Sequence, residues 1–445
     1  MKSLKTVLNI FLIVAMAACL CLCSFTCGKG YGRVVDYQGR GGYIERLTIE
    51  FEKLPAYTYD VYFGDENGVK LDGYTKICSF EAVEKETATV EIKDLVVPAA
   101  AKTLCLDDGF GNQFFLENII KIPGLCLILE ELDYAFGALS DIHYNKYDGY
   151  GQGDDAKIAL KKALDLFESK GVSLVGVAGD VSNDSETDSF TSFIADIKDY
   201  DFDVFTVSGN HDYKAIEDGT WQSIITEAYK NAEGVCDFSP DGYDFTYISP
   251  ADENKSDVFI FLNQTYWDYG SYDSQLLTKS QLQWFSEMVE KYNDKTIYLF
   301  FHSFLAGPKG GANTSVGNIR NPGGYAYKPV FSYGSIEERA FRAILKENKN
   351  IVFFSGHSHW VFEMDVYNED TNFSNFDGEY CYMVHVPSVT APRTIGEQDT
   401  ERTSLAGKES QGWIVSVYDG CIVFEAYDIM TGVVLTDYNQ IIHLD

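Results

Sequence analysis

Residues 204–212 read Val-Phe-Thr-Val-Ser-Gly-Asn-His-Asp, an apolar run followed at once by side chains that can bind metals. Four other apolar runs end in the same way. The five runs are Phe136–Leu139, Val172–Val177, Val204–Val207, Ile297–Phe301 and Ile351–Phe354. Short runs rich in Val, Ile and Phe are typical of strands that are covered on both faces. They therefore predict the strands of a buried sheet.

Four segments between these runs repeat apolar residues at helical spacing or begin with a helix-capping pattern. They are Asp155–Lys170, Phe190–Ile197, the helix that Thr278 and Gln281 open as a capping box, and the helix that Ser335 and Glu338 open. Strands that alternate with helices predict an α/β domain. Ligands of such sheets gather at the carboxyl ends of the strands, so the polar residues after the runs should meet on one rim.

Five of the seven histidines of the chain lie in these polar strings. The strings are Asp141-Ile-His143, Gly179-Asp180, Gly209-Asn210-His211-Asp212, Phe301-His302 and Gly356-His357-Ser-His359. Neutral imidazole is the commonest metal ligand, and carboxylates and carbonyls complete mixed sites for divalent cations. One histidine after a strand is usually an ordinary polar residue, but the complete set predicts a two-metal hydrolytic centre. Gly209 and Gly356 should permit tight turns where larger side chains would block the metals.

The five strings, in this order, resemble the signature of the calcineurin-like metallophosphoesterase family, over roughly Tyr134 to Met430. The resemblance implies an αββα-type α/β sandwich, which we place at residues 134–433. It also implies that Asp141, His143 and His359 hold one metal ion, that Asn210, His302 and His357 hold the other, and that Asp180 bridges the two. This ligand set suits Mn, Fe, Zn or Ni. The second string lacks the tyrosine ligand of purple acid phosphatases.

The same resemblance implies that His211 is not a ligand but faces the substrate, with Asp212 placed to orient or polarise it. Two dications carry four positive charges and Asp141 and Asp180 cancel two, so the site should attract a phosphate anion. We expect hydrolysis of phosphate mono- or diesters by a hydroxide that bridges the two metals. A general acid such as His211 supplies the proton of the leaving oxygen, for a gain of about 10²–10⁴-fold.

A second function class is a non-catalytic surface-binding protein that retains this fold. Such a protein should show a broken ligand set, and this set is intact, so the enzyme is favoured. The formal net charge is −32, and such a surface repels nucleic acid at long range. A small phosphate ester is therefore the expected substrate rather than polymeric nucleic acid. The stretch 303–334 should form the substrate rim and offers Lys309, Asn313 and Arg320 to a phosphate.

The chain begins with a targeting pattern, which we place at residues 1–27. Lys2 and Lys5 precede the apolar stretch Val7–Ala18, which is too short for a membrane span and typical of a signal-peptide core. Met16-Ala-Ala-Cys19 resembles a bacterial lipoprotein box, and Cys27 is a second candidate for lipidation. An ordinary secretory signal is the alternative. We expect an extracytoplasmic protein that contacts the membrane only through such a lipid anchor.

The Gly-rich residues 28–43 are interpreted as a flexible tether. Residues 44–125 contain short alternating runs with turn residues between them, which predict a small all-β, sandwich-like domain. The expected strands are Arg46–Glu52, Tyr57–Phe63, Thr87–Lys93, Thr103–Leu106 and Phe114–Ile122. Near the C-terminus, Gly412–Tyr418 and Cys421–Tyr427 are joined by Asp419-Gly420, which predicts a hairpin.

Overall fold

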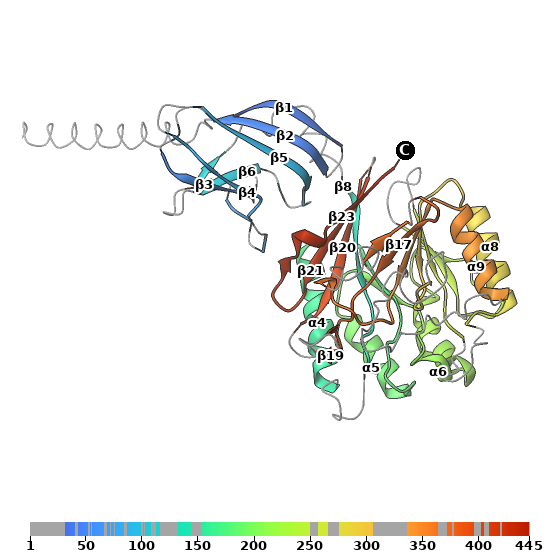
Figure 1. The fold of residues 1–445 in the computed structure, drawn as a ribbon. Helices are drawn as coiled ribbons and strands as arrows, with labels where there is room; N and C mark the ends of the chain where they lie inside the picture. Colours follow the sequence, from blue (N-terminus) through green and yellow to red (C-terminus); the bar gives the residue numbers. More distant parts are fainter. Residues whose placement is uncertain are drawn as a thin grey trace, which may run out of the picture. The chain divides into compact units, whose positions relative to one another are not determined.

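The structure is a computed structural model of the chain. It describes residues 32–115 with short gaps, 132–144, 153–249, 257–265, 276–305, 336–363, 372–395 except 376–377, 402–404, 409–418 and 421–444. The chain forms two compact units (Figure 1). One contains residues 1–132, 417–423 and 441–445, and the other contains residues 133–416 and 424–440.

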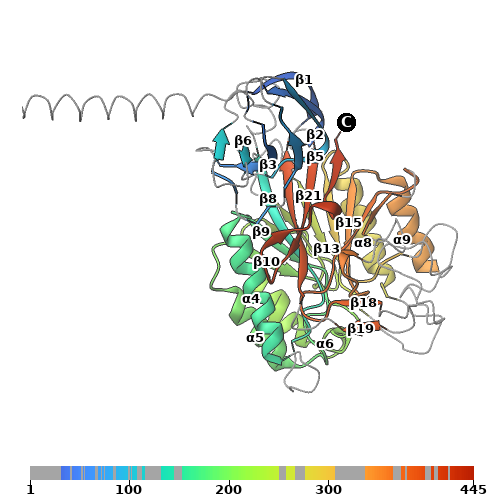
Figure 2. The ribbon, with the colours of Figure 1, turned by 60° about the vertical axis from the view of Figure 1, so that its left-hand side comes forward.

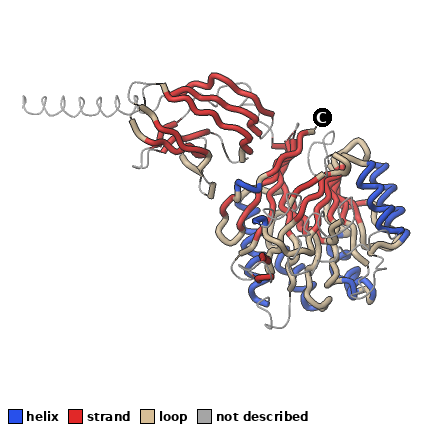
Figure 3. Tube along the Cα trace, in the orientation of Figure 1, coloured by secondary structure: helices blue, strands red, loops and turns tan. Residues whose placement is uncertain are grey.

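The N-terminal unit consists of antiparallel strands in two sheets. One sheet has the order β1 (Gly32–Arg40), β2 (Tyr43–Phe51) and β5 (Ala88–Val96), and the other has the order β4 (Cys78–Glu81), β3 (Thr58–Gly64), β6 (Thr103–Asp107) and β7 (Gln113–Phe115). Alternate residues such as Leu47, Ile49 and Phe51 are buried, as the period of a strand requires. Phe51 stacks on Phe80 of the other sheet with ring centroids 4.9 Å apart. This unit has no helix among its described residues (Figure 3). This agrees with the all-β region predicted from the sequence.

Strand β1 lies where the sequence predicted a flexible tether. Residues 32–40 lie inside the stretch interpreted as flexible, but they pair with β2 from Gly32 opposite Phe51 to Arg40 opposite Tyr43, with two register shifts. The prediction is wrong for these residues because backbone hydrogen bonds to β2 order a segment whose Val34, Val35 and Tyr37 favour strands. The predicted strand Phe114–Ile122 is described only to Phe115, and the targeting segment 1–27 lies outside the described residues.

Two mixed sheets of seven strands each are described in the rest of the chain, and all of their residues belong to the second unit except the parts of β20, β21 and β23 that lie within 417–423 and 441–445. The first has the order β10 (Asp203–Thr206), β9 (Leu174–Val177), β8 (Leu132–Leu139), β20 (Gln411–Tyr418), β21 (Cys421–Asp428) and β22 (Val433–Val434), and β23 (Gln440–His443) also pairs with β21. The second has the order β11 (Val235–Cys236), β12 (Phe245–Ile248), β13 (Val258–Phe261), β14 (Ile297–Phe300), β15 (Ile351–Ser355), β17 (Tyr382–His385) and β16 (Phe373–Ser374). A separate hairpin pairs β18 (Arg393–Ile395) with β19 (Arg402–Ser404).

The helices of this unit lie outside the two sheets. They are α4 (Gly153–Ser169), α5 (Thr187–Ile197), α6 (Tyr213–Glu217), α7 (Glu227–Tyr229), α8 (Lys279–Lys291) and α9 (Ile336–Glu347), with a π-helical turn at Gln222–Thr226 and a 3₁₀ turn at Thr436–Tyr438. In Figure 2, α4 and α5 lie on one side of the strands and α8 and α9 on the other. Phe285 of α8 and Phe341 of α9 belong to one apolar cluster with Leu299 and Phe353 of the second sheet.

Aromatic side chains fill the space between the two sheets. Phe136 of β8 packs against Phe259 and Tyr298 of the second sheet, with ring centroids 5.0 and 4.8 Å apart. Phe205 of β10 contacts Phe261 with centroids 5.4 Å apart. Helices therefore cover the outer faces of two sheets that pack face to face, which confirms the predicted αββα arrangement.

The five predicted strands of the core and all four predicted helices are present with small shifts of their ends. The capping box of Thr278 and Gln281 is formed at the start of α8. Ser335, most of the predicted substrate rim with Lys309, Asn313 and Arg320, and the turn Asp419-Gly420 lie outside the described residues. No helix among the described residues is both long enough and apolar enough to cross a membrane.

Candidate metal centre

The predicted ligands converge where strands of both sheets end. Loops after β8, β9 and β10 of the first sheet carry Asp141, His143, Asp180 and Asn210, and loops after β14 and β15 of the second sheet carry His302, His357 and His359. All seven side chains are buried. Their charged and polar atoms therefore face one another rather than water.

One group consists of Asp141, His143, Asp180 and His359, whose ligand atoms lie within 4.8 Å of one another. Nε2 of His359 is 3.1 Å from Oδ1 of Asp141. Nε2 of His143 is 3.7 Å from both Oδ1 of Asp141 and Oδ2 of Asp180, and 3.2 Å from Nε2 of His359. Nitrogen and oxygen atoms from four side chains thus point at one small volume.

The second group contains Asp180, His302 and His357. Nε2 of His302 is 3.2 Å from Oδ2 of Asp180 and 3.1 Å from Oδ1 of Asn210. Asp180 belongs to both groups, and the same oxygen, Oδ2, faces His143 and His302. This geometry fits a carboxylate that bridges two metal ions.

Each carboxylate has one oxygen held by the protein and one oxygen turned toward the histidines. Oδ2 of Asp141 accepts hydrogen bonds from Ser140 Oγ at 2.7 Å and from the backbone N–H of His357 at 3.0 Å. Oδ1 of Asp180 accepts one from the backbone N–H of His211 at 2.8 Å. Oδ1 of Asp141 and Oδ2 of Asp180 are buried and accept no hydrogen bond of good geometry from the described residues. Buried anionic oxygens without donors are costly, and metal ions between the groups would satisfy them, so the residues fit a dinuclear site.

Backbone carbonyls orient two of the imidazole rings. Nδ1 of His302 lies 2.7 Å from the carbonyl oxygen of Ala178, and Nδ1 of His359 lies 3.0 Å from that of Ala391. A carbonyl accepts only, so Nδ1 carries the proton in each ring and Nε2 presents a lone pair to the cluster. This outer hydrogen bond is the usual support of a histidine that binds a metal.

The ligand loops have an unusual backbone. Asp141, His143, Asp180, His357 and His359 all have φ between 52° and 71°. Non-glycine residues rarely adopt this left-handed conformation, and such strain persists where the surrounding structure imposes it, commonly at functional sites. Five strained residues in one cluster indicate that the fold holds these side chains in place at a conformational cost.

Glycine provides space behind the carboxylates. A Cβ at Gly209 would lie 2.1 Å from Oδ1 of Asp180, and a Cβ at Gly356 would lie 1.8 Å from Ser140 Oγ and 2.6 Å from Oδ2 of Asp141. The two glycines are required because the backbone approaches the metal-binding side chains closely. A larger residue at either position would collide with a carboxylate or with Ser140, so lack of space is the reason why glycine is needed there.

Electrostatics in the cluster favours ionised carboxylates and a positive charge among them. Burial raises the pKa of Asp141, but His359 and His143 hold it well below its usual value. Burial lowers the pKa of His359 to about 4, so this imidazole is neutral. Burial also lowers the pKa of His302, but the charge of Asp180 raises it to about 9. A positive charge is therefore favoured between His302 and Asp180, and a metal cation supplies one.

His211 lies beside the first group without belonging to it. Its ring centroid is 4.9 Å from that of His143, and its Nδ1 is 2.6 Å from the carbonyl oxygen of Asn183. Burial lowers the pKa of His211, but the charge of Asp180 and the Asn183 carbonyl raise it above the ordinary value. The ring is thus oriented by backbone and can carry a proton next to the cluster.

Asp212 does not orient this ring, and that part of the prediction is wrong. Its two carboxylate oxygens accept backbone hydrogen bonds from Val181, Ser182 and Gly209 at 2.8–3.0 Å. The carboxylate of Asp212 is fully buried and lies among these three backbone N–H groups, which supply its hydrogen bonds. The His211 ring is instead hydrogen-bonded to the Asn183 carbonyl. Asp212 therefore ties the Asp180 loop to the Asn210 loop. Its charge still helps to raise the pKa of His211.

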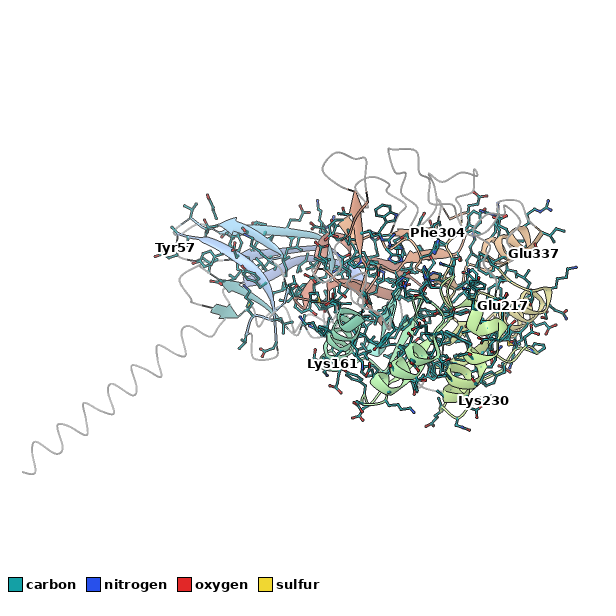
Figure 4. All side chains as sticks on the ribbon, turned by 90° about the horizontal axis from the view of Figure 1, so that it is seen from below. Tyr57, Lys161, Glu217, Lys230, Phe304 and Glu337 are labelled. Atoms are coloured by element: carbon teal, nitrogen blue, oxygen red, sulfur yellow. The ribbon has the colours of Figure 1, made fainter. Side chains whose placement is uncertain are left out.

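Several polar residues around the centre were not singled out from the sequence. Ser140, Asn183, Asn263 and Gln264 all contact the ligand loops. A signal existed for Asn263 and Gln264, because they follow the apolar run 258–262 just as the ligands follow theirs. Phe304, which is labelled in Figure 4, is buried and its ring centroid is 5.8 Å from that of His357.

A family model for calcineurin-like phosphoesterases matches residues 134–361, just over half of the chain. The chain belongs to the calcineurin-like phosphoesterase family. Its members are hydrolases of phosphoester bonds, and those with dimetal centres use two metal ions, which the buried Asp/His cluster fits. The matched region includes every predicted ligand.

Solved structures with a similar fold include a dimetal phosphatase from Danio rerio. It is 13% identical in sequence, has a TM-score of 0.48, and the match covers 71% of this chain and 100% of that chain. Another is a purple acid phosphatase from yellow lupin seeds, at 12% identity and a TM-score of 0.43, covering 93% of this chain and 74% of that one. No curated protein matches the sequence.

Proposed function

We propose that this phosphoesterase is an extracytoplasmic enzyme that hydrolyses small phosphate mono- or diesters. In this proposal Asp141, His143 and His359 hold one metal ion, Asn210, His302 and His357 hold the other, and Asp180 bridges them. When bound, the two metal ions supply Lewis acidity and a nucleophilic water at neutral pH. The observation that carries the proposal is the pair of buried ligand groups that share Asp180.

His211 is the proposed general acid. It lies against His143, so a proton on its ring is close to any ester bound at the centre. Nδ1 is engaged by the Asn183 carbonyl, which leaves Nε2 as the nitrogen that can give a proton to the leaving oxygen. The raised pKa of His211 keeps that proton available toward neutral pH. Asp212 supports this step indirectly, because it fixes the loop on which His211 lies.

Charge supports a small substrate. Removal of residues 1–27, which contain Lys2 and Lys5 and no acid, changes the formal net charge from −32 to −34. A polyanion would be repelled by this surface at long range, within the limit set by screening beyond about 8–10 Å. A small ester is attracted by the local positive charge of two dications and loses little to the rest of the surface.

Location is proposed from the N-terminal sequence. Lys2, Lys5 and the apolar stretch Val7–Ala18 have the form of an export signal, and Cys19 or Cys27 would carry a lipid if the lipoprotein box is used. A lipid on one of these cysteines would hold the phosphoesterase at the outer side of a membrane.

An activity panel tests the proposed function. Purified protein is assayed with a phosphate monoester, a phosphate diester, pyrophosphate and single-stranded DNA, with added Mn²⁺ or Zn²⁺ and with a chelator. We expect metal-dependent hydrolysis of at least one small ester and little cleavage of DNA. Protein that binds two metal ions and hydrolyses none of the esters would overturn the proposal.

A further inference from the structure

The segment that follows β13 contributes no proposed ligand, yet it is completely buried and contacts two ligand loops. We propose that Asn263 and Gln264 are positioning residues that hold Asn210 and His302 at the separation needed to bind one metal ion. The inference rests on the proposed ligand set. It concerns the second metal, because the hydrogen bonds of Asn263 and Gln264 reach Ser208 and Ser303, which lie in the loops of Asn210 and His302.

The first contact is with the loop after β10. The backbone N–H of Ser208 donates to Oδ1 of Asn263 at 2.7 Å, and Ser208 Oγ donates to the carbonyl oxygen of Gln264 at 2.9 Å. The backbone N–H of Gln264 returns a longer bond of 3.4 Å to the carbonyl oxygen of Ser208. Ser208 lies two residues before Asn210, so these bonds fix the start of the loop that presents the Asn210 oxygen.

The second contact is with the loop after β14. Ser303 Oγ donates to Oε1 of Gln264 at 2.5 Å, and Ser303 directly follows His302. Both serines and Gln264 are fully buried, so water does not compete for these bonds. One short segment therefore contacts the neighbours of both Asn210 and His302.

This bridge is needed because the two ligands come from different sheets. Strand β10 is at the edge of the first sheet, whereas β14 lies inside the second sheet next to β13. No strand pairing joins β10 to β14, yet Oδ1 of Asn210 and Nε2 of His302 are only 3.1 Å apart. A link that crosses from one sheet to the other sets this distance.

Asn263 is itself held rigidly. Its backbone N–H donates to Oδ1 of Asp244 at 2.8 Å, its Nδ2 donates to the carbonyl oxygen of Tyr243 at 2.8 Å, and its own carbonyl oxygen accepts from Nε2 of Gln281 at 2.8 Å. Gln281 is also part of the capping box of α8. A buried polar network in which each of these atoms is paired specifies one arrangement of its side chains. The position of Asn263 in this network therefore fixes the position of Ser208, which donates to its Oδ1.

The test measures Mn²⁺ binding to full-length protein by calorimetric titration and by elemental analysis. In Asn263→Ala we expect the affinity for one of two Mn²⁺ ions to fall on the order of 10–100-fold, the usual cost of losing an outer partner, while the other ion binds as before. Ser303→Ala removes only the bond to Gln264 and should weaken the same ion by less. Asn263→Asp keeps the accepting oxygen but loses the amide that donates to the Tyr243 carbonyl, so it should restore only part of the loss.

A matched control is Asn350→Ala. Asn350 Nδ2 donates to the carbonyl oxygen of Lys295 at 2.8 Å, just before β14 and β15 begin. Loss of this bond should reduce the stability of the fold without changing Mn²⁺ binding. Equal weakening of both ions in Asn263→Ala, or unchanged affinities in both Asn263→Ala and Ser303→Ala, would overturn the positioning role while leaving the proposed function intact. Parent protein that binds fewer than two Mn²⁺ ions would overturn the ligand set, and this inference with it.

Discussion

Nε2 of His302 lies 3.2 Å from Oδ2 of Asp180, although the two residues follow strands of different sheets. The centre is therefore built across the seam between the sheets. Its geometry depends on how the sheets pack, and the aromatic layer between them is part of what holds the metal ligands together.

Replacement of Asp180 with alanine should remove both metal ions, since Oδ2 of Asp180 faces both groups. The loss of activity should exceed the roughly 10–100-fold that follows removal of an outer partner. Elemental analysis of the purified variant checks the metal content. Asp184→Ala, at an exposed acid four residues away, should keep two metals. Retention of one metal in Asp180→Ala would argue against the bridge.

Replacement of His211 with alanine should separate chemistry from metal binding. Two metals should remain, and the rate should fall by about 10²–10⁴-fold for esters with poor, alkoxide-like leaving groups but little for activated nitrophenyl esters. The protonated ring is the active form, so activity of the parent should fall as the pH rises through the pKa of His211, and the variant should lack this limb. Asn210→Ala should instead lose one metal and activity toward both kinds of ester. Equal slowing of both kinds in His211→Ala would rule out the acid role.

Replacement of Gly356 with alanine should disturb the first metal. The added Cβ would lie 2.6 Å from Oδ2 of Asp141 and closer still to Ser140 Oγ, so Asp141 must move. We expect lower Mn²⁺ content and activity with a modest loss of thermal stability. Gly378→Ala is the control: its φ is +77° and no atom lies within 4 Å of the added Cβ. It should cost roughly 1–2 kcal/mol of stability, because alanine is strained in the left-handed region, and leave Mn²⁺ binding unchanged.

Asp257 should make stability depend on pH. Burial raises its pKa to about 6, above the value of about 3.9 in an unfolded chain. The folded state therefore prefers the protonated acid, so this contribution is full below pH ~4 and is lost as the pH rises through ~6. Asp257→Asn can still accept the 2.7 Å hydrogen bond from Tyr134 Oη. From pH ~4.5 to ~7.5 the variant should gain about 2 kcal/mol relative to the parent. Urea unfolding measures the difference, and a constant difference would contradict the assignment.

Export should be visible in cell fractionation. We expect the protein outside the cytoplasm, in the membrane fraction if it is lipidated, with incorporation of labelled fatty acid that Cys19→Ser or Cys27→Ser abolishes. A shortened, unlabelled and soluble secreted form would support the ordinary secretory signal. Cytoplasmic protein with an intact N-terminus would contradict both forms of the prediction.

The sequence by itself determined the five strands that end at the site, the helices α4, α5, α8 and α9, and the polar residues that form the candidate metal centre. An apolar run followed by Asp, Asn or His is a local pattern, and so is the capping box at Thr278. The backbone responds to such patterns over a few residues, which is why Asp141, Asp180 and His302 could be named before any contact was known. The same locality misled the interpretation of residues 32–40, whose glycines predicted a tether although β2 pairs with them.

Only the tertiary structure decided how these residues meet. His143 and His359 are 216 positions apart in sequence and 3.2 Å apart in space, and no short-range pattern encodes such a distance. It also decided that Asp212 binds three backbone N–H groups instead of the His211 ring, and that Asn263 and Gln264 cross between the sheets. Partners of buried polar groups are chosen by the packing of whole elements, because each donor or acceptor removed from water must find its partner among whatever the fold places beside it.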